Sequence, residues 1–209
     1  MSNNASREKI RSFLAILLPG DIRKAIHQQF SSKLKKLPLD VKWVEEENYH
    51  LTLKFFGSLN AKEIQQINKI LNRVIPQIEQ FTLSYEGLGV FPDLANPRVI
   101  WLGLSGEVEK LKMLHSKIEN ELSAAGFPRE EKKFQPHLTI GRFRSNSNLE
   151  MFIKYFNELR EAPFSSQIRD IEVQELHLMK SVLTPAGPRY SSLAAYPLRK
   201  NSSENIRSS

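Results

Sequence analysis

The sequence contains no cysteine among its 209 residues. This absence excludes a disulfide framework, thiolate ligands for zinc or iron–sulfur clusters, and a cysteine nucleophile. No apolar run approaches the roughly 20 residues of a membrane-spanning helix, because the longest, at 13–18, is followed by Pro19 and Gly20. The polar, mixed-charge start does not resemble a secretory signal. We therefore expect a cytoplasmic protein without membrane association, whose chemistry comes from other side chains.

Glycine-rich phosphate loops are also missing. Neither G-x-G-x-x-G nor a Walker pattern occurs, which argues against nucleoside triphosphate chemistry. What is present is typical of a globular protein, with 40% hydrophobic and 25% charged residues. The formal net charge of +7 is not gathered into a basic tail or block, so it indicates only a modest attraction to phosphate.

The spacing of apolar residues predicts strands and helices that are interleaved along the chain. Strands are expected at residues 11–18, 41–44, 50–56, 81–85, 98–104, 137–143, 164–168, 171–181 and 190–196, and amphipathic helices at 22–37, from a cap at Asn60 to near Pro76, from a cap at Ser105 to a stop at Gly126, and at 149–159. Short turns between several strands favour antiparallel pairing, so the predicted class is α+β. We expect a flexible segment at 1–10, one domain over 11–198 and a disordered tail at 199–209.

One tripeptide pattern occurs twice, in the two halves of the chain. His50-Leu-Thr52 and His137-Leu-Thr139 both lie in predicted strands. Because successive side chains of a strand alternate between faces, each histidine shares a face with its threonine. A repeat at this distance predicts two related lobes, and packing about a pseudo-twofold axis would set two imidazoles and two hydroxyls across one cleft.

Such a set of groups suits a phosphodiester. In-line displacement at phosphorus needs a base for the attacking oxygen and an acid for the leaving oxygen, and two histidines supply both near neutral pH without a metal. Threonine hydroxyls can donate hydrogen bonds to the non-bridging oxygens. Arg142 is the candidate cation. Strict alternation puts Arg142 on the face of Leu138, so a bulge or the strand end must redirect it.

Histidine and threonine in such motifs also have uses other than phosphodiester chemistry. A single His-x-Thr at a strand edge is commonplace, but two copies with the same apolar flanks favour a site. A zinc site lacks support, because no His-Glu-x-x-His occurs and the nearest carboxylates, Glu47 and Glu131, lie in polar segments. A serine hydrolase lacks its G-x-S-x-G elbow. Among further candidates, Lys54 either faces the phosphate by strand parity or is solvated, and Phe13 either stacks on a base or packs in the core.

The paired motifs make the chain resemble a two-histidine (2H) phosphoesterase, and more closely the RNA 2′,3′-cyclic phosphodiesterases historically called 2′-5′ RNA ligases. The resemblance extends from residue 11 to residue 198. It includes Phe13-Leu-Ala-Ile, Lys42-Trp-Val, the run from Asn48 to Gly57, Gly87-Leu-Gly-Val-Phe-Pro92, Pro97-Arg-Val-Ile-Trp101, the run from Phe134 to Arg142, and Gly187-Pro-Arg-Tyr190. The order and spacing of these motifs are specific, although several are individually weak.

This resemblance implies two pseudo-symmetric lobes, each an antiparallel sheet with helices on its outer face, and an active-site cleft between them. It implies hydrolysis of RNA 2′,3′-cyclic phosphate ends to 2′-phosphomonoesters, with no metal or other cofactor. By position, His50 would be the proton donor and His137 the acceptor, Thr52 and Thr139 would hold phosphate oxygens, and Arg142 matches the family's functional arginine.

The same resemblance leaves several matters open. Gly141 stands where larger residues are common, so looser placing of Arg142 is expected. Reversal of the reaction would join RNA ends through a 2′-5′ bond as a minor activity. The alternatives are a non-catalytic RNA-end binding module and a phosphodiesterase for another cyclic nucleotide. We expect a monomer whose partner is RNA with a cyclic phosphate end, or a related small nucleotide.

Overall fold

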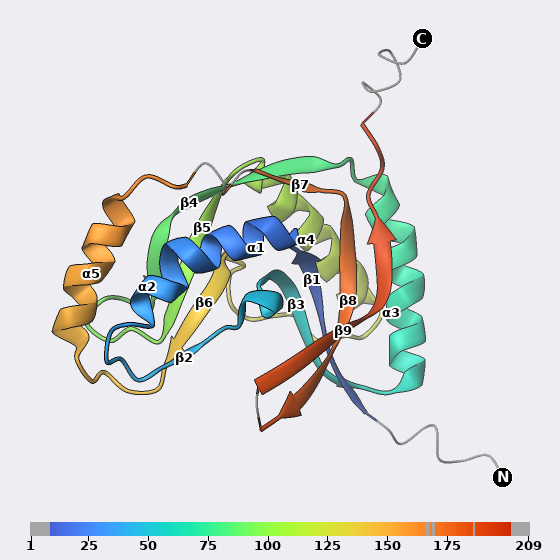
Figure 1. Ribbon diagram of the computed structural model, residues 1–209. Coiled ribbons are helices and arrows are strands. Elements are labelled where there is room, and N and C mark those ends of the chain that lie inside the picture. The colour runs from blue at the N-terminus through green and yellow to red at the C-terminus, as the bar shows by residue number, and fades with distance from the viewer. Residues whose placement is uncertain (1–8, 166–167, 169, 186, 202–209) are drawn as a thin grey trace.

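The computed structural model describes residues 9–165, 168, 170–185 and 187–201 (Figure 1). The strands are β1 (Ile10–Leu17), β2 (Val41–Trp43), β3 (His50–Leu59), β4 (Phe81–Phe91), β5 (Val99–Gly106), β6 (Leu138–Phe143), β7 (Ile171–Val173), β8 (Glu175–Thr184) and β9 (Gly187–Pro197). The helices are α1 (Gly20–Ile26), α2 (Ser32–Leu34), α3 (Ala61–Val74), α4 (Val108–Ala124) and α5 (Leu149–Glu161), with a π turn at His27–Ser31 and 3₁₀ turns at Glu46–Asn48 and Ile75–Gln77.

The nine strands form one curled antiparallel sheet. Eight of them follow one another along the sheet and divide into two four-stranded halves. The order is β7-β4-β5-β6-β3-β1-β8-β9, and β2 pairs with β6 outside this path. The halves meet between β3 and β6, which share a single register pair, Leu51 with Leu138. The predicted α+β class with two antiparallel lobes is confirmed, and the two sheets are hydrogen-bonded into one at this joint.

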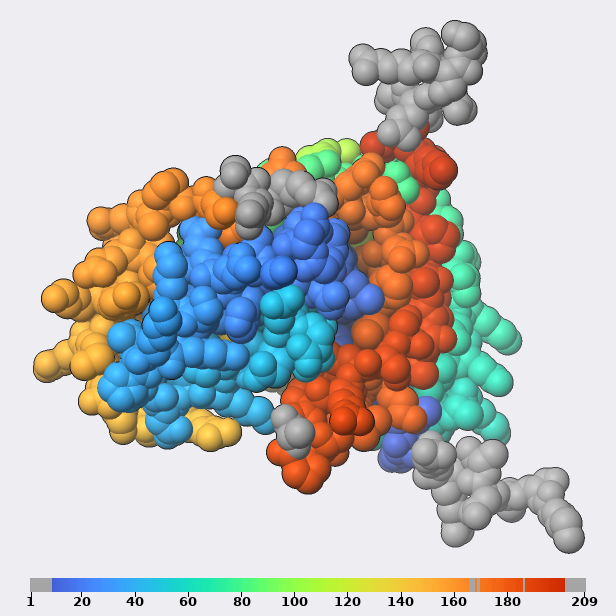
Figure 2. Space-filling view, viewed as in Figure 1, coloured from blue at the N-terminus to red at the C-terminus, as the bar shows by residue number. Residues whose placement is uncertain are grey.

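Each half contains a strand–helix–strand–helix unit, and the two units exchange their first helices. The units are β1–α1–β3–α3 and β5–α4–β6–α5. Helix α4 of the second unit contacts α3 and, through Glu119, the strand β3 of the first. In return, the chain after α1 contacts the segment that follows α5, where the Phe30 and Phe164 rings lie 5.6 Å apart. Figure 2 shows the second of these contacts, with the blue segment seated against the yellow and orange one.

The buried apolar side chains form two clusters, one on each side of the sheet. A single large core beneath the helices joins buried residues of both halves, among them Leu51 and Leu138 at the joint. A small second cluster on the opposite side of the sheet contains Phe13, Ala15 and Met179, with Tyr190 packed against it. Burial on the helix side is therefore extensive, and the other side is left largely open for a ligand.

Several predicted strand limits are wrong. Strand β3 continues through Gly57, which adopts the left-handed φ of 71° without ending the strand. Strand β4 extends to Phe91, so the hairpin with β5 is longer than its apolar pattern indicates. The stretch expected at 171–181 is divided at Gln174 between β7 and β8. Of the strand expected at 164–168, residues 166 and 167 lie outside the described residues, and Phe164, Ser165 and Ile168 are not in a strand.

The helix limits are closer to expectation. Asn60 caps α3 with a complete capping box to Glu63, as predicted. Ser105 does not cap α4, because pairing with Ser84 keeps it in β5, and Glu107 is the N-cap. Of the tail expected at 199–209, residues 199–201 are described, and Arg199 is hydrogen-bonded to Glu79 at 2.8 Å, whereas residues 202–209 lie outside the described residues. Within the described chain, no helix has the length and apolarity needed to cross a bilayer.

Candidate active site

The two His-x-Thr motifs line one cleft at the joint between the halves. His50, Thr52, His137 and Thr139 all border this cleft, whose volume is about 910 Å³. The pair Leu51–Leu138 lies between the motifs and points to the core. Continuing that antiparallel register by one residue sets His50 opposite Thr139 and Thr52 opposite His137. Each imidazole therefore neighbours the hydroxyl of the other half.

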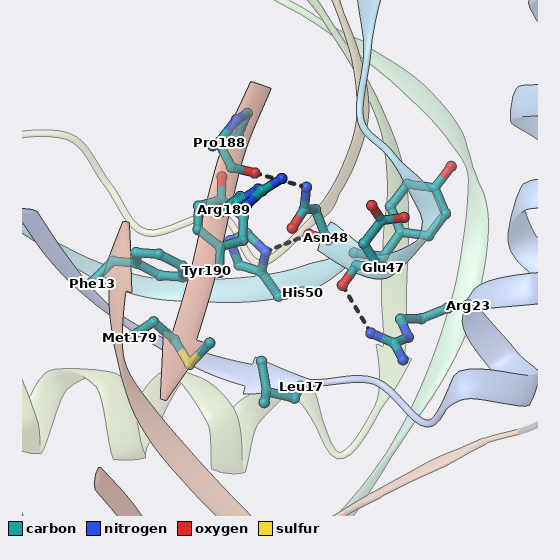
Figure 3. A pocket seen from close by; sticks show the side chains of 11 residues that line it. Phe13, Leu17, Arg23, Glu47, Asn48, His50, Met179, Pro188, Arg189 and Tyr190 are labelled. Atoms are coloured by element: carbon teal, nitrogen blue, oxygen red, sulfur yellow. Dashed lines mark hydrogen bonds between the residues drawn. The ribbon is translucent and has the colours of Figure 1, made fainter. Parts of the chain in front are cut away.

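Both imidazoles are held in the same tautomer by the same local contact. The Nδ1 atom of His50 is 2.7 Å from the carbonyl oxygen of Asn48 (Figure 3), and Nδ1 of His137 is 2.7 Å from that of Gln135. A carbonyl oxygen only accepts hydrogen bonds, so Nδ1 carries the proton in each ring. The Nε2 atom of each neutral ring is left as a proton acceptor.

Aromatic walls enclose each histidine. The His50 ring centroid lies 4.8 Å from that of Phe13 and 5.3 Å from that of Tyr190. The His137 ring centroid lies 5.1 Å from that of Phe91, which itself stacks on Trp101. These apolar surroundings disfavour a charged imidazole.

The electrostatics of the two rings are alike. Burial lowers the pKa of the His50 imidazole below its ordinary value, the hydrogen bond to Asn48 acts against this, and the Arg142 guanidinium lowers the pKa further. For His137, burial again lowers the pKa, opposed by the contact with Gln135 and assisted by Arg142. One cation, which lines the same cleft, therefore acts on both histidines.

A β-bulge brings Arg142 into the cleft. Strand β5 pairs Ile100 with Gly141 and the next residue, Trp101, with Thr139, so Ile140 is an extra residue in β6. An extra residue reverses the alternation beyond it. The bulge turns Arg142 to the face of Thr139, and the side chain lines the cleft with both histidines.

Gly141 is tightly packed rather than loose. A Cβ atom there would lie 2.9 Å from Cγ1 of Val41 and 3.0 Å from the Trp43 ring. Strand β2 crosses closely at this point, pairing Trp43 with Gly141 and Lys42 with Arg142. The expectation that glycine loosens the placing of Arg142 is wrong, because the missing side chain is what allows β2 to support the strand.

The equivalent bulge in β3 removes Lys54 from the cleft. Strand β1 pairs Leu14 with Lys54 and the next residue with Thr52, so Leu53 is the extra residue. Lys54 consequently points to the core side, where it is 2% exposed and its Nζ lies 2.5 Å from Glu119 of α4. Both expectations for Lys54, the phosphate contact and the solvated surface, are wrong, because alternation fails one residue before it.

Phe13 lies beside the site without a free face. It is 3% exposed and packs against His50, Phe55 and Tyr190. The core alternative is the one that the structure bears out, and Phe13 has little surface on which to stack a base. The exposed aromatic ring at the cleft is that of Phe55, at 53%.

The arrangement agrees with three comparisons with known proteins. A family model described as the 2′-5′ RNA ligase superfamily matches residues 20–183. The chain is 34% identical over 190 residues to the RNA 2′,3′-cyclic phosphodiesterase of Methanothermobacter thermautotrophicus, covering 91% of this chain and 100% of that protein. This protein belongs to the 2′-5′ RNA ligase superfamily.

Other similar proteins span the whole domain as well. The RNA 2′,3′-cyclic phosphodiesterase of Thermotoga maritima is 34% identical, over 88% of this chain and 93% of that one. Among solved structures, E. coli LigT complexed with 3′-AMP superposes with a TM-score of 0.72 at 26% identity, covering 91% of this chain and 99% of that one. The similarity therefore includes both halves of the superfamily fold.

Sequence reasoning missed part of this superfamily site. The main-chain carbonyl groups of Asn48 and Gln135 hold the histidines, and each residue stands two positions before its histidine. A main-chain contact of this kind leaves no signal in the residue types. The residues that line the cleft also include Arg98, Lys132 and Lys133, which the sequence did not indicate. Among the described residues, no three His, Asp or Glu side chains converge as metal ligands would.

Proposed function

We propose that this protein hydrolyses RNA 2′,3′-cyclic phosphate ends to 2′-phosphomonoesters, using His50 and His137 as acid and base without a metal. The observation that carries the proposal is a single cleft bordered by two imidazoles of the same tautomer. Relatives at 34% identity that bear the name RNA 2′,3′-cyclic phosphodiesterase support the choice of substrate.

In the proposed reaction, water attacks phosphorus from the side of His137 while the bond to the 3′ oxygen breaks on the side of His50. The Nε2 atom of His137 accepts the proton of the water, and Nε2–H of protonated His50 donates to the departing oxygen. The phosphate remains on the 2′ oxygen. Each histidine ends the turnover in the opposite protonation state, and exchange with solvent resets the pair.

The remaining polar groups would act on the charge of the phosphate. The hydroxyls of Thr52 and Thr139 donate to the non-bridging oxygens, and Arg142 balances the negative charge that develops in the transition state. Burial keeps the pKa of His50 low in the free protein. An anionic diester beside the ring raises that pKa, so substrate binding itself favours the protonated acid.

Product analysis tests the proposal. A 5′-labelled oligonucleotide with a 2′,3′-cyclic phosphate is incubated in EDTA, and the expected product is the 2′-phosphate. His50→Ala and His137→Ala should each lower the rate by about two to four orders of magnitude. The control His177→Ala should not, because His177 is bound to Glu175 and Ser192 and borders neither pocket near the site.

The outcomes separate the alternatives. A 3′-phosphate product contradicts the proposed leaving group, and loss of rate in EDTA contradicts metal independence. Binding of the cyclic end without turnover identifies a binding module, and hydrolysis confined to small cyclic nucleotides identifies a different phosphodiesterase. Full activity of both histidine variants rejects the mechanism.

The assignment of acid and base has its own test. Sulfur in place of the bridging 3′ oxygen makes a leaving group that needs little protonation, because a thiol is far more acidic than an alcohol. This substrate should restore most of the activity of His50→Ala and little of that of His137→Ala. The opposite pattern would exchange the two roles.

The proposal has three further parts. An RNA 5′-hydroxyl can take the place of water as the attacking group. The bond from phosphorus to the 5′ oxygen then forms while the bond to the 3′ oxygen breaks, which leaves a 2′-5′ linkage and a 3′-hydroxyl, so a minor joining activity is expected from cyclic and 5′-hydroxyl ends at high concentration. We also expect a monomer and a cytoplasmic location. Size-exclusion chromatography and cell fractionation test these two.

A further inference from the structure

A second hollow adjoins His50 on the side away from His137. It has a volume of about 400 Å³ and shares Asn48, His50 and Tyr190 with the catalytic cleft. Figure 3 shows it bordered by the Arg23 and Glu47 side chains on one flank and by β9 with Arg189 on the other. We call this hollow the Arg189 pocket. The proposed catalytic steps do not use it.

The charged groups of the Arg189 pocket suit an anion. Arg23 donates from Nη1 to the carbonyl oxygen of Glu47 at 2.8 Å, and its buried Nε has no hydrogen-bond partner among the described residues. The guanidinium of Arg189 is exposed and, within the described chain, makes no ion pair or hydrogen bond. Glu47 is the one lining carboxylate, so two positive charges face one negative charge. Guanidinium groups are well suited to bind phosphate.

The floor of the same pocket is apolar. Leu17, which is 37% exposed, and Met179 line this pocket (Figure 3), and Tyr190 borders both the pocket and the cleft. Leu17 and the half-buried Tyr190 ring offer apolar surface beside the arginines. Apolar or aromatic surface next to a phosphate site is the combination that holds a nucleoside. The pocket therefore has the chemistry for a nucleotide, with its phosphate at Arg189.

The direction of the substrate decides which nucleotide this is. If His50 protonates the departing 3′ oxygen, the terminal ribose lies on the His50 side of phosphorus. The RNA chain leaves that ribose through its 5′ oxygen, and the Arg189 pocket is a hollow that adjoins His50 on this side. The geometry points to this pocket as the subsite for the nucleotide preceding the cyclic end, so that the preferred substrate is an oligonucleotide. This inference rests on the proposed function.

Substrate length tests the inference. We compare kcat/KM for a 2′,3′-cyclic mononucleotide with that for the di- and trinucleotide of the same terminal base at fixed ionic strength. The dinucleotide should be favoured about ten- to hundred-fold, the range of one or two charge-assisted hydrogen bonds, and a third nucleotide should add little.

Variants connect that preference to the pocket. Arg189→Gln should lower the ratio of dinucleotide to mononucleotide kcat/KM by about ten-fold, and Arg189→Glu should lower it further. Lys24→Gln removes an exposed charge one residue from Arg23 and should leave the ratio as it is. As a readout without catalysis, Arg189→Gln should weaken binding of the dinucleotide 2′-phosphate product more than that of the mononucleotide product.

Three results would overturn the inference. Equal kcat/KM for the mono- and dinucleotide, with hydrolysis intact, would remove the subsite and leave the proposed function standing. A ratio unchanged in Arg189→Gln but lowered in Lys132→Gln or Lys133→Gln would move the upstream strand to the other wall. A failure to hydrolyse any cyclic end would reject the proposed function together with the subsite.

Discussion

His50 and His137 owe their common state to contacts made within two residues of each. The carbonyl groups of Asn48 and Gln135 fix the tautomer, and the surrounding aromatic rings keep the imidazoles neutral in the free protein. Because the environments are so alike, the difference between acid and base comes from the substrate. In the proposed reaction, the 3′ oxygen and the water stand on opposite sides of phosphorus, and each histidine acts on the atom on its side.

The shared influence of Arg142 leads to a prediction about pH. Burial and then Arg142 lower the pKa of both histidines. The maximum of kcat/KM lies between the two pKa values of the free enzyme, so we expect it below about pH 6.5, the ordinary histidine value. Arg142→Gln removes a cation that disfavours both imidazolium forms. Both pKa values should rise, and the maximum should move to higher pH as the rate falls.

A pH profile of kcat/KM for the wild type and Arg142→Gln measures this. Arg144→Gln is the control, because Arg144 follows the same strand and does not border the cleft. A maximum that stays in place, or moves to lower pH, would show that Arg142 does not act on the histidines as described.

At the scale of elements, two equivalent bulges shape the site. Leu53 in β3 and Ile140 in β6 each follow the threonine of their motif, and each reverses the alternation beyond it. In β6 the reversal brings Arg142 into the cleft. In β3 it presents Phe55 to the cleft and turns Lys54 inward, so the two halves of the repeat carry different chemistry at equivalent positions.

The inward turn of Lys54 creates a buried ion pair with Glu119, whose side chains are 3% and 8% exposed. Lys54 also donates to the carbonyl oxygen of Pro128, at 2.9 Å. Removing one partner of a buried pair leaves an uncompensated charge, so Lys54→Met should lower the free energy of unfolding by about 3–5 kcal/mol. Replacing Glu119 by Met as well should recover much of this loss. Urea denaturation measures both.

An exposed ion pair between α3 and α4 serves as the control. Arg73 and Glu121 are also 2.5 Å apart, but their side chains are 64% and 37% exposed. Arg73→Met should therefore cost less than about 1 kcal/mol. Equal costs for Lys54→Met and Arg73→Met would mean that burial of the first pair has no energetic consequence.

At the scale of the whole molecule, the halves depend on each other. Their strands share one register pair at the joint, but α4 packs on β3 and α3, and the segment after α1 packs beside the end of α5. The joint is therefore supported by contacts of helices and loops between the halves as well as by the register pair of the strands.

This dependence predicts a single cooperative unfolding transition. Both tryptophans, Trp43 and Trp101, belong to the half that contains β6. Their fluorescence therefore follows that half, whereas far-UV circular dichroism follows the whole chain. The two transitions should coincide in urea, because neither half is stable once the other unfolds. Two separated midpoints would show that the halves fold independently.

Local patterns were sufficient for much of this protein. The capping box at Asn60 with Glu63, the apolar stripes of the helices and the repeated His-x-Thr strands are contained within short stretches, and their physical causes act over a few residues. Four site residues could be named because the repeat doubles a weak signal. The same repeat also predicts two related lobes.

The remaining features depend on contacts between residues distant in the chain. Bulges decide to which side of the sheet Lys54 and Arg142 point, and a bulge is defined only by the pairing with the neighbouring strand. The Arg189 pocket likewise requires β9 to approach the 3₁₀ turn beside His50, where Asn48 donates to the carbonyl oxygen of Pro188 at 3.2 Å. The alternation of side chains within a single strand predicts neither the bulges nor the Arg189 pocket. Both depend on strand register and on contacts between elements, which the packing of the entire chain decides.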